Sequence, residues 1–235
     1  MRTSNKILLG GFVAMILIIT SIHVVLYAKI KNGDLITFRE IEDAGERIVL
    51  GNVKYVSITG FVECRIVPGD TAAIEVGRNW LKSFKYRVVG DSLFVEGGLR
   101  EAEYVMGSRV DAPITLYLPP VESITANYSK VFLRGAEDST NAISRTILIN
   151  NSELNVTATT RELKPAYWKS LQVNALNSQT IFTEGAVVNE LSVNLLSKSS
   201  LTDAGADLQH FSLQVDSTST VSLRKKSLQN IKLVK

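Results

Sequence analysis

The residues that could do chemistry are few and scattered along the chain. The sequence of 235 residues has two histidines, His23 and His210, and one cysteine, Cys64. A single cysteine can form neither an intramolecular disulfide nor a multi-cysteine metal site. Cys64 lies in the alternating stretch FVECRIV, where we expect it to be buried as a small apolar side chain.

His210 is the remaining candidate for acid–base catalysis, but its neighbours in the repeat do not support that role. At a spacing of 20 residues it aligns with Glu190 and Asn230, so no row of carboxylates forms as on a polysaccharide-cleaving β-solenoid. The sequence also has no Gly-rich phosphate loop, no serine nucleophile motif and no metal-ligand spacing. We therefore predict a protein that is not an enzyme, with no catalytic residues, no metal site and no cofactor.

Charge and composition favour a globular protein that does not bind nucleic acid. The 26 basic and 23 acidic residues leave a net charge of only +3, and 45% of the residues are hydrophobic. A basic cluster crowds the C-terminus, where we expect positive charge to keep the last strand edge from pairing with other chains, a ligand-binding patch being the alternative. The cluster consists of Arg224, Lys225, Lys226, Lys232 and Lys235.

An apolar segment at residues 7–28 contains no formal charge apart from a protonatable His23. As a helix it would be roughly 33 Å long, enough to cross a hydrocarbon core of about 30 Å. We predict a membrane anchor or signal-anchor at residues 1–28 and a charged tether at 29–47. The basic Arg2 and Lys6 suit a cytoplasmic N-terminus, but Lys29, Lys31 and Arg39 follow the segment, so charge counting alone leaves the orientation open. The expected location is the bacterial cell envelope, with the domain in the periplasm and anchored to the inner membrane. The alternative is a cleaved signal ending at Ala28, with the domain released or exposed at the surface.

Beyond the tether, alternation of apolar and polar residues predicts an all-β domain. Short alternating runs separated by Gly, Pro and Asp turns make residues 48–120 a less regular first part. From residue 171 the chain aligns with itself at a spacing of 20 residues, and the expected repeat coils cover 121–235. The aligned apolar columns are Leu171, Leu191, Phe211, Ile231; Val173, Val193, Leu213, Leu233; Ala175, Leu195, Val215; Ile181, Leu201, Val221; and Val188, Leu208, Leu228.

This period predicts a parallel β-solenoid, in which each coil pairs with the coils above and below it. The apolar columns would face inward, and the polar runs NSQT, SKSS and STST would form the corners. Between the columns lie outward rows of polar side chains, which are candidate binding residues. The rows consist of Gln172, Ser192, Ser212 and of Asn174, Asn194, Gln214. Tyr167 and Trp168, in an inserted segment at residues 161–168, are further candidates as an exposed aromatic platform or as packing anchors of that loop.

The order of these features resembles the auto-transporter adhesin head GIN domain of bacterial envelope proteins. The similar stretches are GFVECRIVPGDTAAIEVGRNWLKSFKYRVVGDSLFVEG at residues 60–97, ITLYLPPVESITANYSKVFLRG at 114–135, and the serine-rich coils. The resemblance implies an exported parallel β-solenoid and carries no active residues to this chain. It says little about function, because one fold supports many functions.

Two functional hypotheses follow from the sequence. The first is a membrane-anchored, exported module that binds or adheres without catalysis, with polysaccharide or another envelope protein as its partner. The second is a structural spacer or the sensing domain of an envelope complex, in which the polar rows only keep the surface soluble. In both hypotheses the N-terminal helix anchors the protein in the membrane. The sequence does not determine the oligomeric state.

Overall fold

The computed structural model describes residues 45–61, 63–77, 84–97, 114–158 and 164–233, together with the helical residues 12, 15, 20, 21, 23 and 24. The chain divides into two units, Met1–Ala44 and Gly45–Lys235. Most of the predicted anchor and its tether falls outside the described residues. Within the described part of the chain, no helix combines the length and the apolar character needed to cross a membrane.

The second unit is built from two nine-stranded sheets. In spatial order, sheet A consists of β1 (Gly45–Val49), β4 (Ala73–Gly77), β7 (Ile114–Leu118), β3 (Cys64–Pro68), β9 (Lys130–Arg134), β11 (Glu153–Thr157), β13 (Gln179–Thr183), β15 (Ser200–Ala204) and β17 (Thr220–Ser222). Sheet B consists of β18 (Ile231–Leu233), β16 (Asp207–Val215), β14 (Ala186–Leu196), β12 (Ala166–Leu176), β10 (Ile143–Asn150), β8 (Ser123–Asn127), β2 (Tyr55–Thr59), β6 (Ser92–Glu96) and β5 (Lys85–Val89). The described helices are the 3₁₀ turn η3 (Ser139–Asn141) and α3 (Lys225–Gln229).

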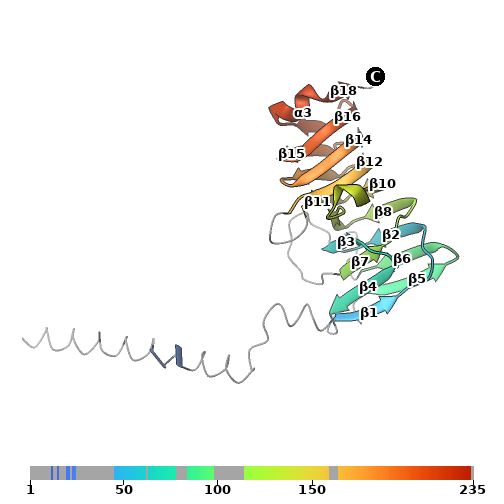
Figure 1. Cartoon of the computed structure of the whole chain (residues 1–235), viewed down its shortest axis with the longest axis vertical. Coiled ribbons are helices and arrows are strands. Elements are labelled where there is room, and N and C mark those ends of the chain that lie inside the picture. The colour runs from blue at the N-terminus through green and yellow to red at the C-terminus, as the bar shows by residue number, and fades with distance from the viewer. Residues whose placement is uncertain are drawn as a thin grey trace, which may run out of the picture. The chain divides into compact units, whose positions relative to one another are not determined.

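Each coil contributes one strand to each sheet, and successive coils pair in parallel, as β12 does with β14 and β14 with β16. Figure 1 shows these strands stacked one above another from β10 to β18. The antiparallel strand pairs among the described strands lie at the other end, where β1 pairs with β4, β4 with β7, and β5 with β6, and isolated antiparallel bridges join Ala136 to Tyr167 and Thr183 to Gly205. The prediction of an all-β parallel β-solenoid is confirmed.

The first coils do not follow one another in sequence order. The coil formed by β2 and β3 lies between the coil of β6 and β7 and the coil of β8 and β9. In sheet B, Val56 of β2 pairs with Leu93 on one side and with Ile124 on the other. The coil of β2 and β3 therefore comes first in the sequence. The second coil, of β6 and β7, stacks on one side of it, and the third, of β8 and β9, stacks on the opposite side.

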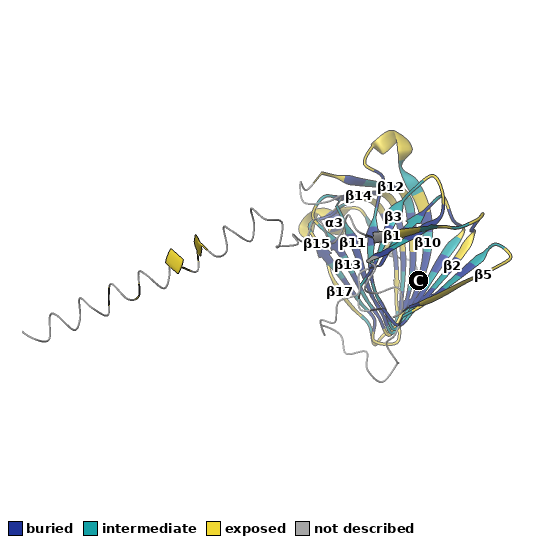
Figure 2. Ribbon diagram, turned by 90° about the horizontal axis from the view of Figure 1, so that it is seen from below, coloured by how far each residue is buried: buried dark blue, intermediate teal, exposed yellow. Residues whose placement is uncertain are grey.

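The apolar columns line the interior, as Figure 2 shows by the buried residues along the stacked strands. Leu171, Leu191, Phe211 and Ile231 pair in register, as do the columns that start at Val173 and Ala175, but Val215, at the end of the Ala175 column, is exposed. Cys64 is fully buried in the core, as expected, and burial raises the pKa of its thiol.

The two remaining columns were wrong in part, and Val221, which pairs with Leu201, is also exposed. Leu201 pairs with Thr180, while Ile181 faces outward and is half-buried. The cause is the corner before β15, where both Ser197 and Lys198 have positive φ, whereas Asn177 alone has positive φ at the corner one coil earlier. Leu228 lies on helix α3 and is exposed, so it does not continue the column of Val188 and Leu208.

Buried serines connect the coils at the corner between sheet B and sheet A. The Oγ atoms of Ser152, Ser178 and Ser199 each accept a hydrogen bond from the backbone N–H of the equivalent serine in the preceding coil, at 3.0–3.2 Å. The Ser129 Oγ likewise accepts from the N–H of Phe61. These hydroxyls satisfy corner N–H groups that the sheets leave without a partner, so the prediction that the serine runs form corners is confirmed.

Candidate functional site

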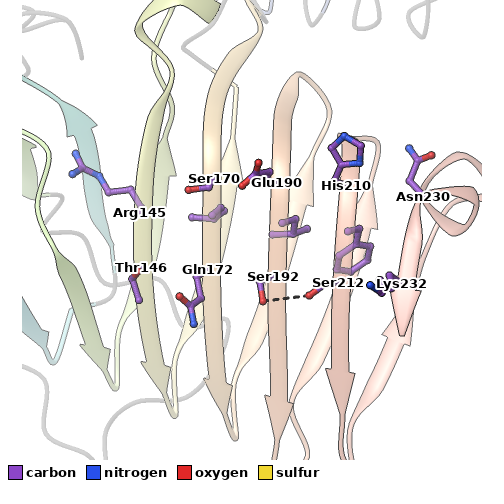
Figure 3. Close-up of a pocket in the computed structure, with 13 residues that line it drawn as sticks. Arg145, Thr146, Ser170, Gln172, Glu190, Ser192, His210, Ser212, Asn230 and Lys232 are labelled. Atoms are coloured by element: carbon purple, nitrogen blue, oxygen red, sulfur yellow. Dashed lines mark hydrogen bonds between the residues drawn. The ribbon is translucent and has the colours of Figure 1, made fainter. Parts of the chain in front are cut away.

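A groove of about 480 Å³ runs across the outer face of sheet B, over β10, β12, β14, β16 and β18. The side chains of two polar rows border it (Figure 3). The first row consists of Ser170, Glu190, His210 and Asn230, and the second of Thr146, Gln172, Ser192, Ser212 and Lys232. Arg145, Leu171, Leu191 and Phe211 complete the lining.

The strand register aligns each row across the coils. Ser170 pairs with Glu190 and Glu190 with His210, while Gln172 pairs with Ser192 and Ser192 with Ser212. Between the rows lie Leu171, Leu191 and Phe211, whose side chains are buried in the core. The backbone of these three residues therefore separates the two polar rows along the groove.

A repeated β-bulge turns the first row outward. In β12, Trp168 and Leu171 are buried, whereas Lys169 is exposed and Ser170 half-buried, so two successive side chains leave the core. The register confirms the irregularity, because Ile143 of β10 pairs with Trp168 and the next residue, Ser144, pairs with Ser170. A bulge re-aims side chains in this way. The same pattern recurs in β14 and β16.

The groove carries little net charge. Glu190 lies in the first row and Lys232 at the end of the second, and no ion pair joins either of them, or His210, to another side chain in the described ranges. A contact of 3.4 Å between the hydroxyls of Ser212 and Ser192 is the one hydrogen bond drawn within the lining (Figure 3). The Asn230 amide donates to the Leu208 carbonyl, whereas the side chains of Thr146, Ser170 and Gln172 face the groove as candidates for an external partner.

Arg145 lies at the β10 end of the groove but is turned toward the interior. It pairs with Leu171, its side chain is almost fully buried, and its two Nη atoms donate to the carbonyls of Leu118 and Pro119 at 3.0 and 2.7 Å. Burial lowers the pKa of the guanidinium to about 10, so Arg145 is still charged at neutral pH. The charged guanidinium therefore binds the backbone carbonyls at the end of β7 and does not face the groove.

Three of the predicted binding residues, Gln172, Ser192 and Ser212, line the groove. The other predicted row, Asn174, Asn194 and Gln214, is in register across the coils but lies outside the groove.

Of the two roles expected for Tyr167 and Trp168, the burial of Trp168 fits packing against the solenoid and not an exposed aromatic platform. Both residues belong to strand β12, and Trp168 is fully buried. A Cβ added at Gly135 would lie 2.9 Å from the Trp168 ring, which shows how closely the indole packs against that backbone. Tyr167 is half-buried, and its backbone exchanges hydrogen bonds with Ala136. Residues 161–163 of the inserted segment lie outside the described residues.

Other groove residues were not among the predicted binding residues, namely Thr146, Ser170, Glu190, His210, Asn230 and Lys232. A sequence signal for the first row existed. The pairs Lys169–Ser170, Asn189–Glu190 and Gln209–His210 each place two polar residues together, at a spacing of 20 residues, within otherwise alternating strands. Such a pair interrupts the alternation and indicates a bulge.

No group of three or more His, Cys, Asp or Glu side chains in the described part of the chain is placed to hold a metal ion. Lys235 of the C-terminal basic cluster lies outside the described residues, and three other members have separate surroundings. Lys226 pairs with Asp207 at 2.8 Å, an Arg224 nitrogen donates to the Ala204 carbonyl, and Lys232 lines the groove.

The fold is similar to crystal structures of bacterial proteins named "putative adhesin". One from Parabacteroides distasonis matches with a TM-score of 0.50 at 11% identity and covers 76% of this chain and 71% of that one. One from Bacteroides fragilis has a TM-score of 0.44 at 11% identity over 81% and 93% of the two chains. One from Parabacteroides merdae has a TM-score of 0.40 at 10% identity over 77% and 95%. The first match shows a shared fold, and the fold comparison rests on it alone.

No family model and no curated protein matches this chain. The assignment to the GIN domain therefore stays a prediction.

Proposed function

We propose that this chain is an exported envelope protein whose solenoid is a non-catalytic binding or adhesion module, with the groove on sheet B as its ligand site. The observation that carries the proposal is the pair of polar rows repeated on consecutive coils, whose hydroxyl and amide groups lie open on one face. The name given to the Parabacteroides distasonis protein of the same fold agrees with such a role.

The same proposal keeps residues 1–28 as the anchor that holds the solenoid in the periplasm, with cleavage and release as the alternative. Protease treatment of intact and permeabilised cells, combined with the mass of the mature chain, tests this part. Protection of a full-length chain in cells with an intact outer membrane supports anchoring in the periplasm. Cleavage of the domain in intact cells supports exposure at the surface.

The binding role is tested with full-length protein in detergent, mixed with polysaccharide and protein fractions of the cell envelope. The groove variant carries Gln172→Ala, Ser192→Ala and Ser212→Ala. Its matched control carries Gln179→Ala, Ser200→Ala and Thr220→Ala, which form the equivalent row on sheet A of the same coils.

We expect the groove variant to lose at least about tenfold in affinity, because a good interface loses about one hydrogen bond at each truncation, while the control binds normally. Equal binding by both variants, with unchanged melting temperatures, would show that the groove is not the ligand site.

A further inference from the structure

Building on the proposed function, we infer that the ligand of the groove is a neutral, linear polysaccharide that lies along the solenoid axis, with successive sugars over successive coils. The groove crosses the strands instead of following them, because its lining comes from the same positions of β10, β12, β14, β16 and β18. A ligand that fills it must therefore be extended and perpendicular to the strands.

The spacing between neighbouring coils indicates which kind of polymer can be the ligand. Neighbouring parallel strands lie about 4.8 Å apart, so the five strands span roughly 19 Å. This step is close to the length of one pyranose unit in a linear chain, so each sugar meets the same two positions on each coil. An extended peptide rises by only about 3.4 Å per residue and would lose register with the coils.

The chemistry of the rows matches sugar hydroxyls. The neutral polar side chains of the groove are Thr146, Ser170, Gln172, Ser192, Ser212 and Asn230, and each type can both donate and accept hydrogen bonds, although the Asn230 amide already donates to the Leu208 carbonyl. A sugar hydroxyl also does both, whereas a phosphate or carboxylate ligand needs donors alone. Hydroxyl and amide side chains that recur over several coils therefore suit a polyol better than an anion.

The charges of the groove disfavour an acidic polymer. Glu190 lies in the middle of the first row, where its carboxylate would repel the uronate or phosphate of an anionic chain. Lys232 lies at the β18 end, and the other lysine or arginine of the lining, Arg145, is buried and bonded to two carbonyls. A polyanion would therefore meet one exposed basic side chain of this kind at one end only.

The affinity must accumulate along the chain. Phe211 is the one Phe, Tyr or Trp residue of the lining, and it is buried, so within the described lining only the imidazole of His210 offers an aromatic ring to a sugar. Each sugar is then held by hydrogen bonds, and each added unit raises the affinity roughly three- to tenfold, the value of about one net hydrogen bond.

Both ends of the groove are defined by the strands. At one end the first row stops at Ser170 of β12 and the second row stops at Thr146 of β10, and the pairing of β10 with β8 begins only at Ile147 and Ile124. At the other end β18 is the last strand of sheet B. The gain in affinity with ligand length therefore stops at about five sugars, one for each strand that contributes to the groove.

The test is calorimetric titration of the full chain in detergent with neutral β-1,4-linked oligosaccharides, from disaccharide to octasaccharide. A matched uronic acid series and a soluble Ser/Gln peptide serve as comparisons. We expect the affinity for the neutral series to rise with length and to level off near the pentasaccharide, with the uronic series and the peptide at least about tenfold weaker. An affinity that does not change with length, or equal binding of the uronic series, would overturn the inference.

Two surface variants sharpen the test. Glu190→Gln removes the negative charge but keeps the size, so the ratio of the uronic to the neutral affinity should rise several-fold. Lys232→Ala should weaken the longest neutral chains and leave the trisaccharide unaffected. Glu184→Gln, on the turn after β13, is the charge-matched control and should change neither series.

The inference and the proposed function can fail separately. If the triple groove variant loses an envelope ligand but no neutral oligosaccharide binds the wild type, the sugar inference fails and the binding module stands. If neither the envelope fractions nor the oligosaccharides bind through the groove, both fail.

Discussion

The two parts of the solenoid are built by different rules. From β10 onward, coils that are neighbours in sequence are neighbours in space, and most of their pairings keep a constant offset. Before β10, the coil of β2 and β3 lies between two later coils, and antiparallel strands close the stack. Contacts in the repeat part are therefore local, whereas those of the first part join residues far apart in the sequence.

This difference predicts which part of the solenoid unfolds cooperatively. A stack of sequential coils is stabilised by interfaces between nearest neighbours, so its end can fray without the rest. The inserted coil cannot unfold by itself, because β2 pairs with β6 on one side and with β8 on the other, and both would lose a partner. We expect the first part to unfold as one unit and the last coils to open locally.

The largest expected effect comes from Ile58→Ala in the inserted strand β2. Ile58 is fully buried, and its truncation should lower the free energy of global unfolding by about 3–5 kcal/mol. Leu213→Ala in β16 is the comparison. It should mainly raise local opening of the last coils, because it lies near the free end. Urea unfolding combined with hydrogen exchange measures both, and equal global losses would contradict the difference between the two parts.

Arg145→Met probes the junction between the two parts. The guanidinium of Arg145, in the first strand of the repeat part, holds the carbonyls of Leu118 and Pro119 from the earlier part. Without it two carbonyls lose charged donors, and we expect a loss of about 2 kcal/mol in urea unfolding. An unchanged or higher stability would mean that the cost of burying the charge outweighs its two hydrogen bonds.

Ser178→Ala tests the corner that is shared by the repeating coils. The change leaves the backbone N–H of Ser152 buried without its acceptor, so we expect a loss of about 1–2 kcal/mol. Ser219→Ala is the matched change at the end of the serine ladder. It should cost less than about 0.5 kcal/mol, because water can reach that half-buried corner. Thermal unfolding measures the stability of both variants. Equal shifts in melting temperature would show that burial of the corner does not determine the loss of stability.

The smallest expected effect concerns Asp216, at the corner of the last complete coil. Its carboxylate accepts hydrogen bonds from the Ser219 side chain and from the N–H groups of Ser197 and Thr218, which lower its pKa to about 2. The folded pKa is thus below the unfolded value of about 3.9, so its contribution is full above about pH 4 and is lost as the pH falls through about 2.

The melting temperature of the wild type should therefore exceed that of Asp216→Asn slightly at pH 7. The difference should shrink between pH 4 and pH 2. A difference that stays constant with pH would exclude the carboxylate charge as its source.

The repeat part could be predicted from the sequence because its contacts are periodic. Leu171, Leu191 and Phe211 share one inward column, and Gln172, Ser192 and Ser212 share one outward row, for the same reason of alternation. The prediction failed at Ile181, where one extra corner residue in the following coil changed the offset to 21. A fixed period cannot detect such a change, because the inserted residue lies in a polar corner that carries no apolar signal.

The candidate site could be predicted only in part. The second row of the groove followed from alternation, but the first row depends on the bulge that turns Ser170, Glu190 and His210 outward. Trp168 was assigned to an exposed loop because the insertion before it interrupts the period, whereas β12 extends back to Ala166 and buries the indole.

By itself the sequence determined the class of the fold, the inward columns, the serine corners and the lack of a recognisable catalytic pattern. These properties depend on which residues alternate and recur, and that information is local. Only the tertiary structure decided that the coil of β2 and β3 lies between later coils and that two polar rows border one groove. Backbone hydrogen bonds join any two strands of suitable length, so the side-chain pattern of a strand does not specify which edge it meets.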